Sequence, residues 1–434
     1  MIETLKKTAQ NAVNALKEAG ADKAQADVSY VITHEFNVDG GEFSLFRTLF
    51  DKQLKLTAIQ DGRKGTVSQN RYDDETIASS AKACLEAAAS AGPDKNWDFA
   101  PVSRNEDFTL GEVKPDLDKL FFRCKELLES VKSRFPKIMM EQMIVSHTET
   151  FKAKANSYGV LYSTHEGNYS VELMFSGHDG DKASSFFGSG VVTDTLDKPF
   201  MELGTIEKDL SDVEKQIETT VVDGKFEGTV VLTPGCLGSF IASVLMDFAG
   251  EGGLLSGTSP WKDKLGEKVA DERITVSLSP LDERIVCGDR ITGEGFRAED
   301  FDIIKDGSLN AFAIGLYASN KLKLPRGLND SFCLVMPSGS EPLEKIISSI
   351  DKGIVVGRFS GGQPSSNGDF SGVAKNSFLI ENGKIGRALS ETMISGNLAD
   401  MLFRLRGISS EQTADGMSVL PCGVAFDGIT ISGK

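Results

Sequence analysis

The sequence has very few histidines and no paired cysteines. Its 434 residues contain four histidines, so a site that depends on imidazole groups has few side chains available. The six cysteines stand singly, without C-x-x-C spacing, which argues against both a zinc ribbon and a disulfide framework. We therefore expect each cysteine to behave as a small buried apolar residue.

Long apolar runs are also missing, and we expect no secretory leader. No run approaches the ~18 apolar residues of a membrane helix, and the N-terminus leads directly into an amphipathic helical pattern. The chain has 63 acidic and 47 basic residues, and its net charge of -16 disfavours contact with a phosphate backbone. We expect a cytoplasmic protein that binds neither membranes nor nucleic acid directly.

The hydrophobic pattern predicts an α+β fold with N-terminal and middle α+β units and a glycine-rich, strand-rich C-terminal domain with short helices. The expected domains are 1–92, 101–222 and 223–434. Apolar residues at three- and four-residue steps, and Gly or Pro at the boundaries, predict helices. These are about residues 2–19, 74–89, 115–131, 235–248, 342–350 and 398–405, with another helix opening at the capping box Ser211–Glu214.

Two His-Glu pairs could suggest half of a zinc-protease motif. His34-Glu35 and His165-Glu166 both lie in strand-like sequence, and neither has a second histidine four or five residues later. A zinc-protease motif needs two imidazoles projecting from one helix and a glutamate that activates water. We therefore interpret both pairs as solvated strand residues.

Glycine pairs offer a different kind of candidate site. Gly361-Gly362 most simply forms a tight turn, but backbone beside such glycines can also pair with an extended peptide as an added strand. We retain Gly361 and Gly362 as candidate substrate-binding residues. The predicted helix at 235–248 has one unbroken apolar face, and its periodicity alone predicts an ordinary core helix.

The sequence resembles the TldD/PmbA family, also known as modulators of DNA gyrase. The resemblance spans nearly the whole chain and is most specific from this helix onward. The segments that carry it occur in the order typical of the family. They include Asn156-Ser157-Tyr158-Gly159, Lys264-Leu265-Gly266-Glu267, Gly293-Glu294-Gly295, Val335-Met336-Pro337-Ser338-Gly339, Gly368-Asp369-Phe370-Ser371-Gly372 and Ile394-Ser395-Gly396-Asn397.

The resemblance implies a metallopeptidase relative without its metal site. Family members of the TldD type have H-E-x-x-x-H on this helix, and the three positions correspond here to Ala242, Ser243 and Asp247. The third ligand of the family, a cysteine in a G-x-C-G-K segment, has no counterpart, because Cys422 lies outside such a motif. We expect no metal, no cofactor and no catalytic residue in this chain, and therefore inactivity when it is alone.

The pattern resembles the TldE/PmbA branch, which implies a partner carrying the zinc. A TldD-type sister subunit would form a heterodimer with this chain and cleave extended peptides in proteolysis or peptide maturation, although a homodimer is also compatible. Two alternatives stay open. One is an independent hydrolase with a non-standard site that involves Asp247. The other is a protein-binding regulator, suggested by the family's older name.

Overall fold

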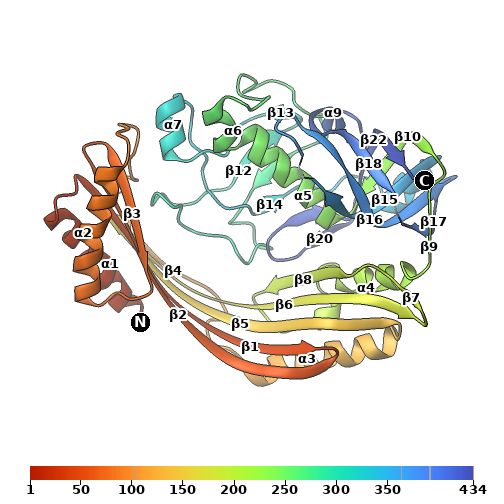
Figure 1. Cartoon of the computed structure of the whole chain (residues 1–434), viewed down its shortest axis with the longest axis horizontal. Coiled ribbons are helices and arrows are strands. Elements are labelled where there is room, and N and C mark those ends of the chain that lie inside the picture. The colour runs from red at the N-terminus through yellow and green to blue at the C-terminus, as the bar shows by residue number, and fades with distance from the viewer. Residues whose placement is uncertain (103, 363, 391, 434) are drawn as a thin grey trace.

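The computed structural model describes residues 1–102, 104–362, 364–390 and 392–433. A long curved sheet from the N-terminal half forms a cradle, and the C-terminal half lies on its concave side (Figure 1). The α+β fold class predicted from the sequence is confirmed. No helix within the described ranges combines the length and apolar character that a membrane crossing requires.

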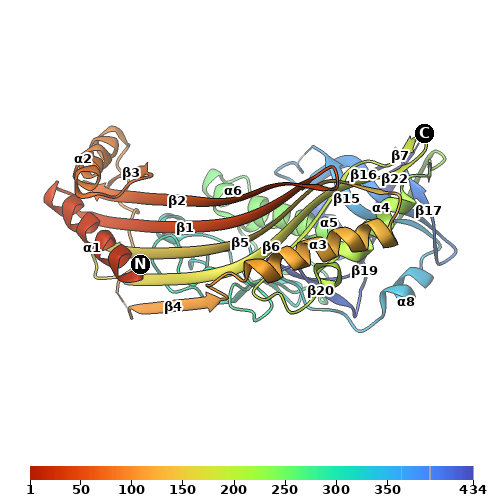
Figure 2. The ribbon, with the colours of Figure 1, turned by 90° about the horizontal axis from the view of Figure 1, so that it is seen from below.

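The cradle is one eight-stranded sheet in which four very long strands run side by side (Figure 2). Its strand order is β3-β2-β1-β5-β6-β4, and β7 and β8 also pair with β6. The strands are β1 (Lys23–Asp39), β2 (Glu42–Gln60), β3 (Arg63–Gln69), β4 (Glu106–Gly111), β5 (Ile138–Asn156), β6 (Leu161–Asp179), β7 (Lys182–Ala183) and β8 (Phe187–Thr193).

Tight turns that contain glycine join β1 to β2 and β2 to β3. Gly40 and Gly41 connect β1 to β2 with φ of 56° and 81°, and Asp61-Gly62 connects β2 to β3 with φ of 50° and 70°. Positive φ at both central residues is the geometry of the two-residue turn that matches the twist of a hairpin. The glycines therefore fix where each hairpin reverses.

Helices pack against this sheet at both of its ends. One end of the sheet packs under α1 (Ile2–Glu18) and α2 (Asp74–Ser90). The other end packs under α3 (Leu117–Arg134), the short helix η1 (Phe200–Glu202) and α4 (Ile206–Lys215). Two separate hydrophobic cores lie against this sheet, and residues 1–92 and 101–222 contribute to both, because β1 pairs with β5 over fifteen residues.

The capping box at Ser211–Glu214 does not open a helix, and this prediction was wrong. The helix α4 begins at Ile206, so Ser211 lies inside it. Ile206, Leu210 and Val213 are buried along one face of the helix. Burial of this face against the sheet determines the start of the helix, and the local capping signal does not.

The C-terminal half contains two further sheets. The first has the order β15-β10-β22-β18-β16-β17-β9, with β19 beside β22, and an added β15–β16 pairing closes five of its strands into a ring. The second has the order β13-β12-β11-β14-β21-β20. The first sheet contains β9 (Thr219–Thr220), β10 (Lys225–Leu232), β15 (Lys352–Gly361), β16 (Asp369–Glu381), β17 (Lys384–Leu389), β18 (Met393–Asn397), β19 (Leu405–Ile408) and β22 (Val424–Ser432). The second contains β11 (Val276–Leu278), β12 (Phe301–Lys305), β13 (Ser308–Leu309), β14 (Leu334–Val335), β20 (Gln412–Ala414) and β21 (Val419–Pro421).

Short helices complete this half of the chain. The large core between the two sheets surrounds α5 (Pro234–Val244), which continues as a π-helical turn, η2 (Leu245–Ala249). The other helices are α6 (Glu251–Ser256), α7 (Leu316–Leu322), α8 (Leu343–Ser348) and α9 (Leu398–Phe403). The predicted helices near 235–248, 342–350 and 398–405 are confirmed, whereas the sequence reasoning missed α6 and α7.

Candidate functional site

The helix α5 starts directly after strand β10 and is built to be buried. Pro234 occupies its first turn, where the missing backbone N–H is not needed for the helix. Phe240 packs edge-on against the rings of Phe359 and Phe370, at centroid distances of 5.2 and 5.1 Å. The apolar face predicted from the sequence therefore anchors α5 against the strands of the ring.

The opposite face of α5 has almost no side chains. Gly235 and Ser239 are exposed, and Gly238 and Ala242 are partly exposed, at steps of three and four residues. We call these four residues the α5 strip. The strip ends at Met246, which is 53% exposed. The short side chains let another backbone approach the helix closely at Gly235 and Ser239, whereas Leu420 of β21 lies beside Gly238.

The π-helical turn lies immediately after the strip. Residues 245–249 adopt it, and Asp247 is its central residue. In a regular α-helix, positions i and i+5 lie about 140° apart around the axis, since each residue turns by about 100°. A π turn is wider and brings position 247 back toward the face of position 242. The backbone thus favours side chains at these two positions meeting on one face.

The side chains at these positions do not fit a catalytic zinc ion. Ala242 ends in a methyl group, and the buried hydroxyl of Ser243 donates a hydrogen bond to the carbonyl of Ser239 at 3.1 Å. Burial alone raises the pKa of Asp247, whose carboxylate is the remaining donor. A catalytic zinc needs about three protein ligands. In the described parts of the chain, no three His, Cys, Asp or Glu side chains are close enough to hold a metal ion.

The two His-Glu pairs occupy strands, as predicted. His34 and Glu35 are neighbours on β1, so their side chains point to opposite faces of the sheet. His34 Nδ1 is 2.9 Å from Thr48 Oγ1, whereas Glu35 accepts a hydrogen bond from Arg47 at 2.9 Å. Glu35 is buried, so the expectation that both residues are solvated was wrong for it.

Gly361 and Gly362 lie at the end of β15, on the strand nearest to α5. Gly361 pairs with Gly372 of β16, and a Cβ there would meet the Gly372 Cα at 2.7 Å, so this close strand contact requires glycine. Strand β10 pairs with β15 only as far as Val356. Within the described residues, 358–361 therefore have no strand neighbour on the side away from β16.

Two cavities lie at the ends of α5. A cavity of about 190 Å³ borders its first turn at Pro234 and Gly235, and also contacts Gly357 of β15. A larger cavity of about 410 Å³ borders Met246 and Gly250 at the other end. The α5 strip runs between them, so the three features form one candidate binding region.

Asp209 is a site residue that the sequence reasoning missed. It lines the smaller cavity from α4, and its Oδ2 accepts hydrogen bonds from Ser189 and Thr205, both at 2.7 Å. Burial raises the pKa of Asp209 from 3.8 to about 6, although both hydroxyl donors oppose the rise. Its position depends on the packing of α4 against β8, which no local sequence signal predicts.

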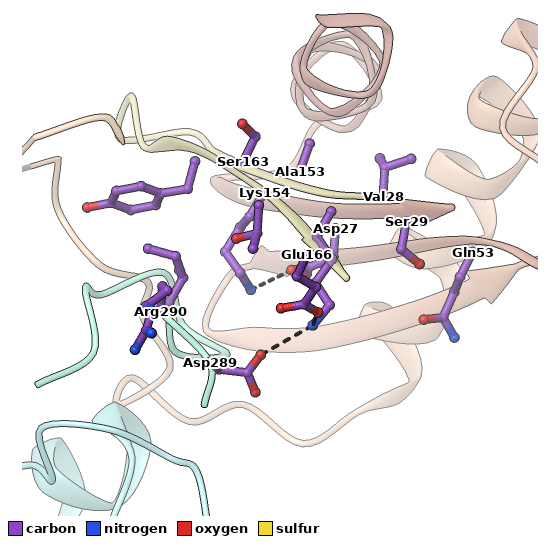
Figure 3. A pocket seen from close by; sticks show the side chains of 14 residues that line it. Asp27, Val28, Ser29, Gln53, Ala153, Lys154, Ser163, Glu166, Asp289 and Arg290 are labelled. Atoms are coloured by element: carbon purple, nitrogen blue, oxygen red, sulfur yellow. Dashed lines mark hydrogen bonds and ion pairs between the residues drawn. The ribbon is translucent and has the colours of Figure 1, made fainter. Parts of the chain in front are cut away.

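A charged interface holds the loop before Gly293 against the concave face of the sheet (Figure 3). Asp289 and Arg290 from this loop lie opposite side chains of β1, β5 and β6 around a cavity of about 190 Å³. Lys152 pairs with Glu166 at 2.8 Å and with Asp289 at 3.3 Å. Lys154 donates a hydrogen bond to the carbonyl of Gly293 at 2.8 Å. These contacts orient the C-terminal half relative to the sheet.

Comparisons with known proteins agree with this architecture. The metalloprotease PmbA of Escherichia coli O157:H7 is 25% identical over 425 residues, which cover 92% of this chain and 91% of that protein. A zinc metalloprotease TldD homolog of Saccharolobus solfataricus is 24% identical over an alignment that covers 71% of this chain and 70% of that protein. The crystal structure of TldE from Thermococcus kodakarensis superposes with a TM-score of 0.85 at 19% identity, covering 98% of this chain and 99% of that one, and therefore shows a common fold.

The C-terminal half provides the direct link to a family. Residues 225–433 match the PmbA/TldA metallopeptidase C-terminal domain. This range contains α5, the π-helical turn and both sheets of the C-terminal half. The C-terminal half is therefore a PmbA/TldA metallopeptidase C-terminal domain, and the chain as a whole is similar to metalloproteases of the PmbA and TldD type.

Proposed function

We propose that this chain is the zinc-free, TldE/PmbA-like subunit of a TldD/TldE-type metalloprotease that acts in proteolysis or peptide maturation. The proposal rests on α5, whose π-helical turn is present but whose side chains at positions 242 and 247 do not form a metal site. Its π-helical turn favours positions 242 and 247 meeting on one face, but Ala242 cannot bind a metal. Loss of the ligands without loss of the helix geometry is what an accessory subunit of this family requires.

The proposed role of the α5 region is to bind part of an extended peptide. Gly235 and Met246 are eleven positions apart, which corresponds to about 16 Å of helix and to about five residues of extended peptide. The peptide backbone would pair with residues 358–361 of β15 as an added strand and reach the α5 strip through the cavity that Gly235 and Gly357 both line. Gly361 and Gly362 would then contact the substrate at the end of this edge.

The proposed partner is a TldD-type sister chain, and the first half of β2 is the surface that we propose for it. Strand β3 pairs with β2 only from Leu54 onward, so in the described structure residues 42–53 have a strand neighbour on one side only. We call residues 42–53 the β2 edge. Its large apolar side chains are between 42% and 65% exposed: Phe43, Leu45, Phe46, Leu49 and Phe50.

A long apolar strand edge of this kind is a template for pairing with another chain. A sister chain of the same fold would offer an equivalent edge, so the two sheets could join antiparallel about a pseudo-twofold axis. The double variant Leu45→Lys/Leu49→Lys should therefore abolish the complex without unfolding the chain. Ile385→Lys on β17 is the matched control, because Ile385 is 51% exposed and lies outside the β2 edge.

Co-expression with a sister chain that carries an intact H-E-x-x-x-H motif tests the proposal. We expect a stable complex that contains one zinc per pair and cleaves unfolded peptides. Separate elution of the two chains, with full peptidase activity in the sister alone, would refute the subunit role. So would stoichiometric zinc bound at residues 242–247 of the isolated chain.

Peptidase assays on the isolated chain separate the proposal from an independent hydrolase. After chelator treatment the purified chain should show no activity, because its donor set does not fit a catalytic metal. Activity that survives chelation and disappears in Asp247→Asn would instead support a non-standard site.

A further inference from the structure

A polar cavity of about 250 Å³ lies at the N-terminal end of the sheet, away from the α5 strip. Strands β2 and β3 form one wall, and the loop at Trp97 together with α7 forms another. Figure 1 shows α7 facing the β3 end of the cradle. We call it the lysine cavity, because Lys55 and Lys64 both line it.

Two carboxylates, Asp98 and Glu294, line the cavity beside the lysines, but neither forms an ion pair with them. The β2–β3 register places Lys64 beside Ile59 and Thr66 beside Thr57, so these side chains and Lys55 share one face of the sheet. Within the described residues neither Lys55 nor Lys64 forms an ion pair, although the chain has a net charge of -16. Burial, and secondly the charge of Lys55, hold the pKa of Lys64 below its usual value.

Lys64 is held in place by an aromatic stack. Its Nζ lies over the ring of Trp97 at 4.2 Å from the centroid, and Trp97 stacks on Tyr317 with centroids 3.7 Å apart. The Tyr317 hydroxyl in turn donates a hydrogen bond to Asp94 at 3.0 Å. The ammonium group is therefore ordered before any ligand arrives, which lowers the entropic cost of binding.

Glu294 connects this cavity to the α5 region. It lines both the lysine cavity and the cavity beside Met246. Its Oε1 accepts a hydrogen bond from the backbone N–H of Leu316 at the start of α7, at 3.1 Å. Asp98, which also lines the cavity, pairs with Lys23 at 2.9 Å. Lys55 and Lys64 together therefore outweigh the one remaining carboxylate, Glu294, and the cavity favours an anion.

We propose that the lysine cavity binds the C-terminal carboxylate of a peptide whose preceding residues lie along the α5 strip. This inference rests on the peptide-binding role proposed above and adds the end at which the peptide is recognised. Lys55 and Lys64 contact the carboxylate, and Trp97 forms the wall beside it. The chain would thus select peptides that have a free C-terminus.

The test compares two short acetylated alanine peptides, one with a free C-terminal carboxylate and one with a C-terminal amide. Fluorescence of Trp97 reports binding to the isolated chain, since the other tryptophan, Trp261, is buried in the core. We expect the acid to bind at least about tenfold more tightly, as is typical of hydrogen bonds to charged groups. Lys64→Gln and Lys55→Gln should each reduce this preference, and Lys82→Gln on the outer helix α2 should preserve it.

Equal affinity for the acid and the amide, or no binding of either, would overturn the inference. So would an unchanged preference in both Lys64→Gln and Lys55→Gln. Inorganic phosphate that binds as tightly as the peptide acid would make this a general phosphate site and would also overturn the assignment. The assay contains no sister chain, so its failure is distinct from failure of the complex to form.

Discussion

Replacing Asp209 with asparagine should stabilise the protein, and more so as the pH rises. The carboxyl group is mostly buried, and burial raises its pKa to about 6. Ser189 and Thr205 donate hydrogen bonds to the same oxygen, Oδ2, both at 2.7 Å. Asparagine retains an oxygen that can accept both bonds, but it cannot ionise. The variant therefore removes the buried charge without removing the contacts.

The sign and size of the effect follow from the raised pKa. The folded state binds the proton of Asp209 more tightly than the unfolded chain does. The stability gained from this proton is therefore complete below about pH 3.8 and is lost as the pH rises through about 6. The difference between the two values corresponds to about 3 kcal/mol, at about 1.4 kcal/mol per pKa unit. Solvent contact at the carboxyl group reduces this energy. We therefore expect the free energy of unfolding of Asp209→Asn to rise, relative to the wild type, by about 1–2 kcal/mol between about pH 4 and about pH 8.

Urea unfolding at a series of pH values measures this gain directly. Asp212→Asn on the same helix is the matched control, because it removes a carboxylate that pairs with Lys208 and Lys215. The control should bring no gain in stability as the pH rises. A constant free-energy difference between Asp209→Asn and the wild type across the pH range would refute the reasoning.

Two further substitutions test the packing of the fold. In Gly65→Ala the new Cβ would lie 2.1 Å from the backbone oxygen of Cys84, so α2 cannot dock and unfolding should become easier by at least about 2 kcal/mol. Gly92→Ala is its control, since nothing lies within 4 Å of the added methyl, and equal effects would contradict the argument. Phe248→Ala should cost about 3–5 kcal/mol in urea unfolding, because Phe248 is fully buried against Trp261. Met246 in the same π turn is 53% exposed, so Met246→Ala should cost far less stability. Similar losses in the two variants would argue against the burial of the Phe248 ring.

Helices with a long apolar stripe could be predicted from the sequence with little error. The stripes at 2–19 and 74–89 correspond to α1 (Ile2–Glu18) and α2 (Asp74–Ser90). In each case the apolar residues recur within the helix itself, so the signal is local. The start of α4 was placed wrongly because its apolar residues are few, and a local capping signal competed with them.

The arrangement around the candidate site could not be predicted in the same way. The π-helical turn at 245–249 has no distinct sequence signal, since its apolar periodicity continues that of α5. Aspartate and lysine side chains are mostly exposed in folded proteins, so the sequence alone places Asp209 and Lys64 at the surface. Only distant segments, β8 for Asp209 and α7 for Lys64, enclose them in cavities.

The sequence alone determined the α+β class, the hairpin turns and the chemical character of positions 242, 243 and 247, because periodicity, glycine placement and side-chain identity are properties of neighbouring residues. The tertiary structure decided that two N-terminal units share one sheet, that the β2 edge is left without a second strand, and that two lysines face one cavity without forming an ion pair. These features depend on pairings between segments far apart in the chain. The free energy of each pairing comes from burial and register across the whole fold, which a local pattern does not contain.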